Sequence, residues 1–126
     1  MSDTYKNVTN KHSEESCRPF REILSLVGDK WSIILISLLE NKTKRFSELQ
    51  RDVSEISQRI LSLSLRNLER NGLVSRRVES TVPPSVYYSL TPLGETLLVY
   101  VKEIINWTRI NYKEIKKSQE LFDQKR

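Results

Sequence analysis

Residues 46–71 read FSELQRDVSEISQRILSLSLRNLERN, and this stretch decides the fold. Phe46, Leu49 and Val53 recur at the spacing of one helix face, which predicts a short helix at the start of the stretch. Ser57 is a good N-cap for a second, longer helix, and the residues just before it predict a turn. A short helix, a tight turn and a longer basic helix together fit the major groove of DNA. The stretch therefore predicts a helix-turn-helix.

The longer helix is predicted to end at Asn71–Gly72, where glycine supplies a left-handed residue. At about 100° per residue, Leu61, Leu65 and Leu68 share one face, which we expect to pack in the core. The start of the helix and its opposite, basic face are predicted to contact DNA through Ser57, Gln58, Arg59, Ser62, Leu63, Arg66 and Arg70. Arginine can bind guanine O6 and N7, and an exposed leucine can contact a thymine methyl group. The alternative is that these arginines only form a solvated face.

Positive charge gathers around the same stretch. The chain has 21 lysines and arginines against 16 acidic residues, and residues 41–80 alone hold nine basic and five acidic ones. Such a balance favours an anionic partner, either nucleic acid or a membrane surface. Outside the basic helix, the predicted contacts to DNA phosphates are Lys42, Lys44, Arg45, Arg76 and Arg77. Arg76 and Arg77 are neighbours in a predicted strand, so their side chains are expected on opposite sheet faces, and only one of them is expected to reach a phosphate from the hairpin.

The flanking segments predict three more helices and a hairpin. Helices are expected over 19–27 and 30–40, the second of which is apolar almost all round and forms the centre of the core. Residues 41–45 read as a short basic connection. Strands are expected over 73–79 and 86–90, joined by a proline-containing tip.

The last helix is predicted to open at Thr91–Pro92 and to continue to about residue 122, which makes it roughly 45 Å long. The fold class is therefore mainly α with a small β-hairpin: a winged helix-turn-helix over 17–126, preceded by a mobile N-terminal arm over 1–16. The apolar stripe of the last helix extends beyond what one small domain covers, so a second subunit is the natural cover. The predicted dimer interface comprises Leu97, Val101, Ile104, Thr108, Tyr112 and Ile115. The helix before Gly28 is expected to assist, and the alternative is a last helix folded back on its own domain.

Several kinds of site are not expected in this sequence. The longest apolar run, Trp31–Leu39, is too short to span a membrane, and the first sixteen residues do not read as a signal peptide, so a cytoplasmic location is expected by default. With one cysteine and one histidine, the chain offers no internal disulfide, no metal site and no catalytic pair. We therefore predict no metal, no cofactor and no enzymatic activity.

Short sequence motifs along the chain occur in the same order as in a known family. These motifs are Cys17 ahead of Pro19; Gly28–Trp31; Arg45–Leu49; Ile56–Leu61; Leu65–Glu69; Gly72–Val74; Val82–Pro84; and Tyr87–Gly94. The chain resembles the HxlR family of bacterial and archaeal winged-helix regulators, which are relatives of the multiple-antibiotic-resistance repressors. The match covers about residues 17–110 and departs from the family at Arg18–Pro19 and at Gln58, where proline is common. The resemblance implies a DNA-binding homodimer.

Cys17 has two interpretations. A helix N-terminus and a neighbouring arginine both favour the reactive thiolate, whereas Glu14 and Glu15 oppose it. The resemblance implies that a cysteine at this position can sense oxidants or electrophiles. The alternative is a structural cysteine that packs as a small apolar residue.

These observations predict a sequence-specific transcriptional repressor or activator that binds double-stranded DNA as a homodimer on an inverted-repeat operator. A redox response through Cys17 and a small-molecule effector stay open. The competing function is a winged-helix protein-interaction module without specific DNA binding, because a fold does not fix a function.

Overall fold

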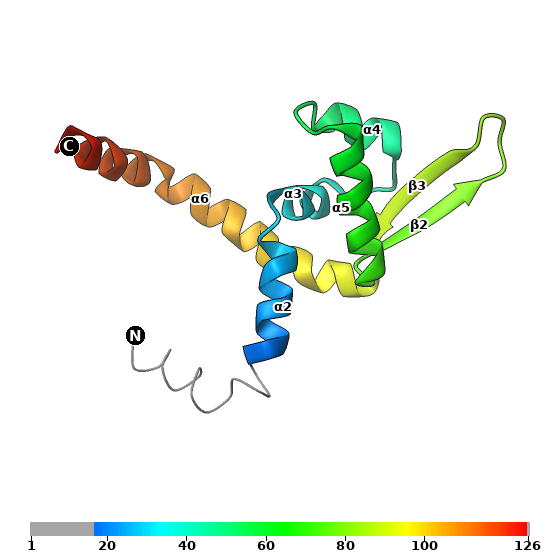
Figure 1. Cartoon of the computed structure of the whole chain (residues 1–126), viewed down its shortest axis with the longest axis horizontal. Coiled ribbons are helices and arrows are strands. Elements are labelled where there is room, and N and C mark those ends of the chain that lie inside the picture. The colour runs from blue at the N-terminus through cyan, green and yellow to red at the C-terminus, as the bar shows by residue number, and fades with distance from the viewer. Residues whose placement is uncertain (1–16, 126) are drawn as a thin grey trace.

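The computed structural model describes residues 17–125, and the predicted arm over 1–16 lies outside the described residues. The elements follow the predicted order: α2 (Arg18–Val27), α3 (Lys30–Leu38), β1 (Lys44–Arg45), α4 (Phe46–Asp52), α5 (Gln58–Arg70), β2 (Val74–Glu79), β3 (Ser85–Leu90) and α6 (Pro92–Gln124). We call α3, α4, α5 and the sheet the head. Figure 1 shows α2 and α6 projecting from this head in different directions. The mainly α winged helix-turn-helix is confirmed.

Helix α3 lies at the centre of the core, as its nearly uniform apolar sequence predicts. Its Leu35 and Ile36 are almost fully buried, as is Leu39 at its C-cap. The helix packs against α2, α5 and α6. It ends at Leu38, close to the predicted end at about Glu40, and Asn41 in the turn that follows takes a left-handed backbone conformation with φ of 54°.

A buried polar cluster ties α3 to α5. The carboxylate of Asp29 caps α3, where its Oδ1 accepts a hydrogen bond from the backbone N–H of Trp31 at 3.3 Å. Its Oδ2 accepts bonds from the hydroxyls of Ser32 at 2.9 Å and Ser64 at 3.2 Å. Both serines are buried, and Ser64 belongs to α5. The cluster therefore fixes α5 relative to the helix in the centre of the core.

The predicted helix ends are confirmed at α5 and α6. The Ser57 hydroxyl accepts a hydrogen bond from the N–H of Ile60 at 3.1 Å, and Gly72 has a φ of 75° just after α5. The Thr91 hydroxyl caps α6 by accepting from the N–H of Gly94 at 3.0 Å. Gly94 also lies so close to Leu73, the residue before β2, that an added Cβ would sit 2.0 Å from the Leu73 carbonyl oxygen. Only glycine permits this approach of α6 to the sheet.

The sheet has three antiparallel strands in the order β1-β3-β2, one strand more than the predicted hairpin. The extra strand, β1, lies within the predicted connection, where Lys44 pairs with Tyr88 and Arg45 pairs with Tyr87. Two residues are too few to show a strand pattern in the sequence, and their strand state depends on the edge that β3 provides. The two hairpin strands differ from the predicted bounds by one residue each, at their first residues.

Candidate nucleic-acid interface

The outer face of α5 is exposed and basic, as predicted. Its buried face consists of Leu61, Ser64, Leu65 and Leu68, with the three leucines at most 1% exposed. The opposite stripe is exposed along the whole helix and comprises Arg59, Ser62, Leu63, Arg66 and Arg70. Figure 1 shows α5 running along the head beside the β2–β3 hairpin. The structure therefore brings the predicted set of α5 side chains together on one surface.

The turn before α5 is held by its own hydrogen bond. The side-chain amide of Gln50 in α4 donates to the carbonyl oxygen of Ile56 at 2.8 Å. Ile56 is itself buried, so the turn is fixed on both sides. Together with the Asp29–Ser64 bond, this contact gives α5 a set position relative to α4.

One face of the sheet carries two arginines stacked on a tyrosine. Arg45, Tyr87 and Arg77 lie opposite one another across the three strands. The guanidinium carbon of Arg77 lies 5.0 Å from the centre of the Tyr87 ring, and that of Arg45 lies 5.8 Å from it. Arg77 also pairs with Glu79 at 3.3 Å, and Arg45 Nη2 donates to the Ser85 hydroxyl at 2.9 Å. The Arg77 side chain is still 60% exposed, so its charge remains accessible.

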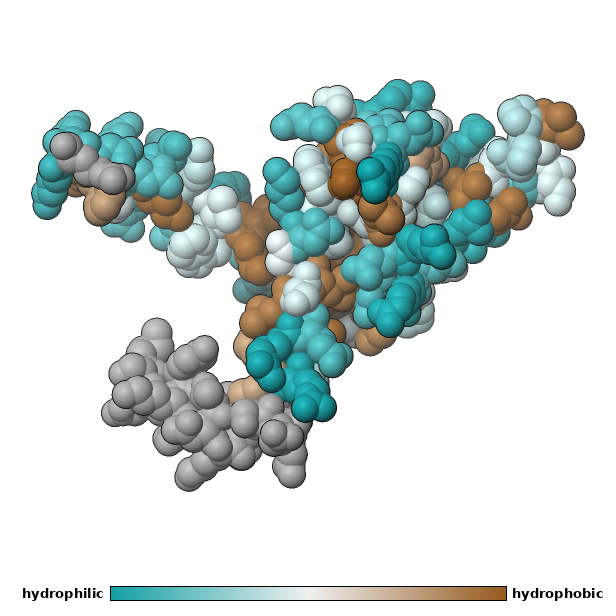
Figure 2. Space-filling model, viewed as in Figure 1, coloured by the Kyte–Doolittle hydropathy of each residue, from teal (hydrophilic) through white to brown (hydrophobic). Residues whose placement is uncertain are grey.

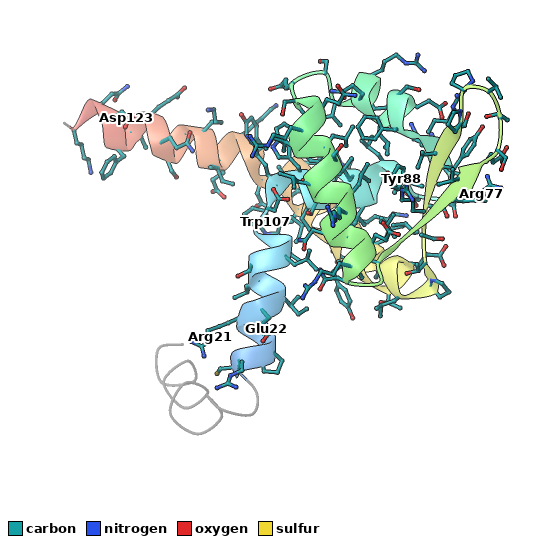
Figure 3. The ribbon with its side chains drawn as sticks, turned by 45° about the vertical axis from the view of Figure 1, so that its right-hand side comes forward. Arg21, Glu22, Arg77, Tyr88, Trp107 and Asp123 are labelled. Atoms are coloured by element: carbon teal, nitrogen blue, oxygen red, sulfur yellow. The ribbon has the colours of Figure 1, made fainter. Side chains whose placement is uncertain are left out.

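The opposite face of the sheet turns toward α5. Arg76 pairs with Tyr88, and both residues line a groove with Ser62, Arg66 and Glu69 of α5. Figure 3 shows Tyr88 between the helices and the hairpin, and Arg77 on the outer side of the hairpin. The expectation that Arg76 and Arg77 occupy different faces is therefore confirmed.

The two lysines before α4 differ in their surroundings. Lys42 is exposed, whereas Lys44 Nζ forms an ion pair with Asp52 and its side chain is only 17% exposed. Lys44 is therefore poorly placed for the predicted phosphate contact, because little of its side chain is exposed and its ammonium already pairs with Asp52. No sequence pattern links Lys44 to Asp52, because the ion pair forms only when β1 packs against α4.

The predicted dimer residues on α6 fall into two groups. Val101 is 1% exposed and packs in the core of its own chain, so little of its side chain is left to contact a second subunit. Leu97 is half-buried against the same core. Ile104 and Tyr112 are more than half exposed, and the remaining predicted residues, Thr108 and Ile115, are exposed and half-buried respectively.

Sequence reasoning missed further exposed apolar side chains on the projecting helices. On α6 these are Tyr100, Trp107, Ile110 and Leu121, and on α2 they are Phe20, Ile23 and Leu24. An apolar groove of about 250 Å³ lies between α2, the start of β2 and α6, lined by Ile23, Leu26, Asn71, Leu73, Leu93, Thr96, Leu97 and Tyr100. Figure 2 shows apolar surface where α6 passes α2.

Other kinds of site are not seen in the part of the chain that the structure describes. Within residues 17–125 there is no group of three side chains that could hold a metal ion. No helix in the same range is both long enough and apolar enough to cross a membrane. Cys17 lies at the N-cap of α2 and is half-buried.

Comparison with known proteins agrees with this geometry. The model of the HxlR-like helix-turn-helix family matches residues 26–116. This range spans the helix-turn-helix and the β2–β3 hairpin, which is the wing of the fold. The chain belongs to this family. The HTH-type transcriptional regulator YtfH of Escherichia coli (strain K12) is 39% identical over 101 residues, which cover 80% of this chain and 79% of that relative.

Solved structures of regulators are similar to this chain as well. The redox regulator HypR in its reduced form has 39% sequence identity and a TM-score of 0.74, and the match covers 79% of this chain and 98% of HypR. The reduced form of the transcriptional regulator YodB from B. subtilis has 34% identity and a TM-score of 0.62, over 70% of this chain and 86% of YodB. The HxlR-type chain is therefore a DNA-binding transcriptional regulator.

Proposed function

We propose that this regulator is a cytoplasmic homodimer that reads an inverted-repeat operator with α5 of each subunit. The observation that carries the proposal is the division of α5 into two faces. Leu61, Leu65, Leu68 and Ser64 are fixed in the core, while its arginines are exposed along the opposite stripe. A helix held in this way presents its side chains to DNA without the cost of ordering the helix on binding.

The base-reading role falls to the first half of α5. Recognition helices contact base edges with their N-terminal residues, which here are Gln58, Arg59 and Ser62. Arg59 is exposed and has no ion-pair partner among residues 17–125. Its guanidinium is suited to bind guanine O6 and N7. Arg77, stacked on Tyr87 at the outer side of the wing, is suited to bind backbone phosphate.

A second copy of the chain is the proposed cover for the exposed apolar residues of α2 and α6. Tyr100, Ile104, Trp107 and Phe20 are each more than half exposed in the single chain. A soluble monomer rarely exposes so much contiguous apolar surface. Two-fold pairing through these helices sets the two α5 helices about 34–36 Å apart, so half-site centres are expected about 10 base pairs apart.

Selection from a random duplex pool tests this function. The native protein is expected to select a two-fold symmetric site. Arg59→Ala is expected to relax the preference at particular bases, at a cost of about 1–3 kcal/mol in discrimination. Arg77→Ala is expected to weaken binding to all sequences alike and to lower the salt slope by about one. Arg109→Ala removes the same charge from exposed α6 and serves as the control.

Two results would contradict the proposal. Binding that does not depend on salt, or no enrichment of any duplex, would favour the protein-interaction module instead. Identical shifts in base preference for Arg59→Ala and Arg77→Ala would remove α5 as the reading helix.

A redox response through Cys17 is a second proposed property. Two of the similar structures are a redox regulator in its reduced form and a diamide-treated YodB. Cys17 is the chain's single cysteine, so a disulfide needs a second thiol, from the other subunit or from a small molecule. Diamide takes two electrons and two protons from the pair of thiols and becomes a hydrazine. We expect diamide to change operator affinity in the native protein and not in Cys17→Ser; equal responses would leave Cys17 a structural residue.

A further inference from the structure

The groove between α5 and the wing is a polar surface built from two distant parts of the chain. It has a volume of about 340 Å³ and is lined by Ser62, Arg66, Glu69, Arg76 and Tyr88. Three of these residues lie on α5, and the other two lie on β2 and β3. The groove is therefore a junction between the reading helix and the wing.

Strand register decides which arginine of the wing faces this groove. Arg76 pairs with Tyr88, which is 8% exposed because its ring packs toward the helices. Arg77 is the next residue, so strand alternation sends it to the other face, over Tyr87. Figure 3 shows Tyr88 and Arg77 on these two sides of the hairpin. Only Arg76 can work together with Arg66.

The side chains that line the groove have a net positive charge that favours binding of one anion. Among residues 17–125, neither Arg66 nor Arg76 has an ion-pair partner within 4 Å, unlike Lys44, Arg77 and Lys102. Two guanidinium groups and the Glu69 carboxylate leave one positive charge. A phosphodiester carries one negative charge, which would balance it. The hydroxyl of Tyr88 can donate a further hydrogen bond to one of its oxygens.

We infer that this groove binds one phosphate of the duplex backbone, held jointly by Arg66 and Arg76. The inference rests on the proposed function, because it needs α5 in the major groove. A sugar-phosphate strand of the DNA then runs along the edge of the major groove, and the sheet beside α5 contacts this strand. Arg66 is accordingly a phosphate anchor rather than a base reader, and the wing and the reading helix share one contact instead of making two.

A double-mutant cycle tests the shared contact. Arg66→Ala and Arg76→Ala are each expected to lower operator affinity about tenfold and to reduce the salt slope by about 0.9. Because both variants lose the same phosphate, the double variant is expected to lose little more in affinity or slope than either single one. The matched control pairs Arg66→Ala with Arg77→Ala, whose losses should multiply and whose slopes should add.

A chemically altered operator gives a second readout. Each phosphate of the operator DNA is replaced in turn by an uncharged methylphosphonate. One position per half-site is expected to weaken binding of the native protein about tenfold and to leave the Arg66→Ala/Arg76→Ala protein unaffected. Circular dichroism of each variant checks that the fold is intact.

The outcomes separate this inference from the proposed function. If the losses from Arg66→Ala and Arg76→Ala multiply as the control pair's do, the shared phosphate is wrong and the operator-binding function stands. If no arginine variant and no methylphosphonate changes affinity, both are wrong.

Discussion

The two parts of α6 both carry apolar residues at helical spacing, but their surroundings differ. In its first ten residues, Pro92–Val101, Gly94 meets Leu73, and Leu98 and Val101 are buried in the head. Over residues 102–124, only Asn111 and Ile115 are even half-buried. Figure 1 shows this second part leaving the head. The difference shows that apolar periodicity identifies a face to be covered but does not say whether the same chain or another one covers it.

The largest effect is expected from charge in the docked part of α6. Val101→Asp places a carboxylate in a core where the native side chain is 1% exposed, with no partner nearby. An unpaired buried charge destabilises by about 3–5 kcal/mol, a large share of the stability of a small domain. We expect loss of the cooperative thermal transition measured by circular dichroism. Val99→Asp is the matched control, since Val99 is 56% exposed on the same helix, and it should melt like the native protein.

Charge in the projecting part should change assembly instead of folding. Ile104 is 59% exposed in the single chain, so Ile104→Asp leaves the head's own contacts in place. In the proposed dimer it would bury a charge, and we expect the mass measured by light scattering to fall to that of a monomer. Operator affinity should fall with it, since one subunit contacts one half-site.

Asn106→Asp is the control for Ile104→Asp, because it introduces the same charge at an exposed position about 160° around α6 from Ile104. It is expected to keep the dimer mass. A dimer that persists in Ile104→Asp would remove this part of α6 from the interface and leave its apolar residues unexplained.

Much of the head could be predicted from the sequence, because its signals are local. Ser57, Gly72 and Thr91 mark helix ends through hydrogen bonds and backbone angles that involve only nearby residues. The two faces of α5 follow from leucine spacing alone. Local chemistry of this kind is independent of how the elements later pack.

The features that the sequence did not predict depend on contacts between distant segments. Strand β1 exists only because β3 offers it an edge, and the Lys44–Asp52 pair follows from it. Val101 and Ile104 lie on adjoining parts of one helix, yet the head covers only Val101. The groove of Arg66 and Arg76 likewise needs the register of the hairpin against α5.

A smaller effect is expected where α6 begins. Gly94→Ala introduces a Cβ that would meet the Leu73 carbonyl oxygen at 2.0 Å, so the helix or the strand must shift. Overpacking of this kind typically costs about 1–3 kcal/mol. We expect a native-like spectrum with a lower midpoint in thermal and urea unfolding. Thr96→Ala, an exposed change two residues on, is the control; an unchanged midpoint in Gly94→Ala would mean that α6 docks more loosely than the structure indicates.

The smallest effect is expected at the boundary between the two parts of α6, where Lys102 Nζ pairs with Glu40 Oε2 at 2.5 Å. The side chains are 55% and 37% exposed, so water and salt screen the attraction, and holding two long side chains in place has an entropic cost. Lys102→Ala should therefore lower the free energy of unfolding by at most about 1 kcal/mol. A double-mutant cycle with Glu40→Ala, followed by urea unfolding at low and high salt, isolates the pair, and its coupling should shrink as salt rises. A coupling energy above about 2 kcal/mol that does not change with salt would contradict this prediction. It would mean that Lys102 and Glu40 are more buried than in the single chain, as they would be if the second subunit also covered this part of α6.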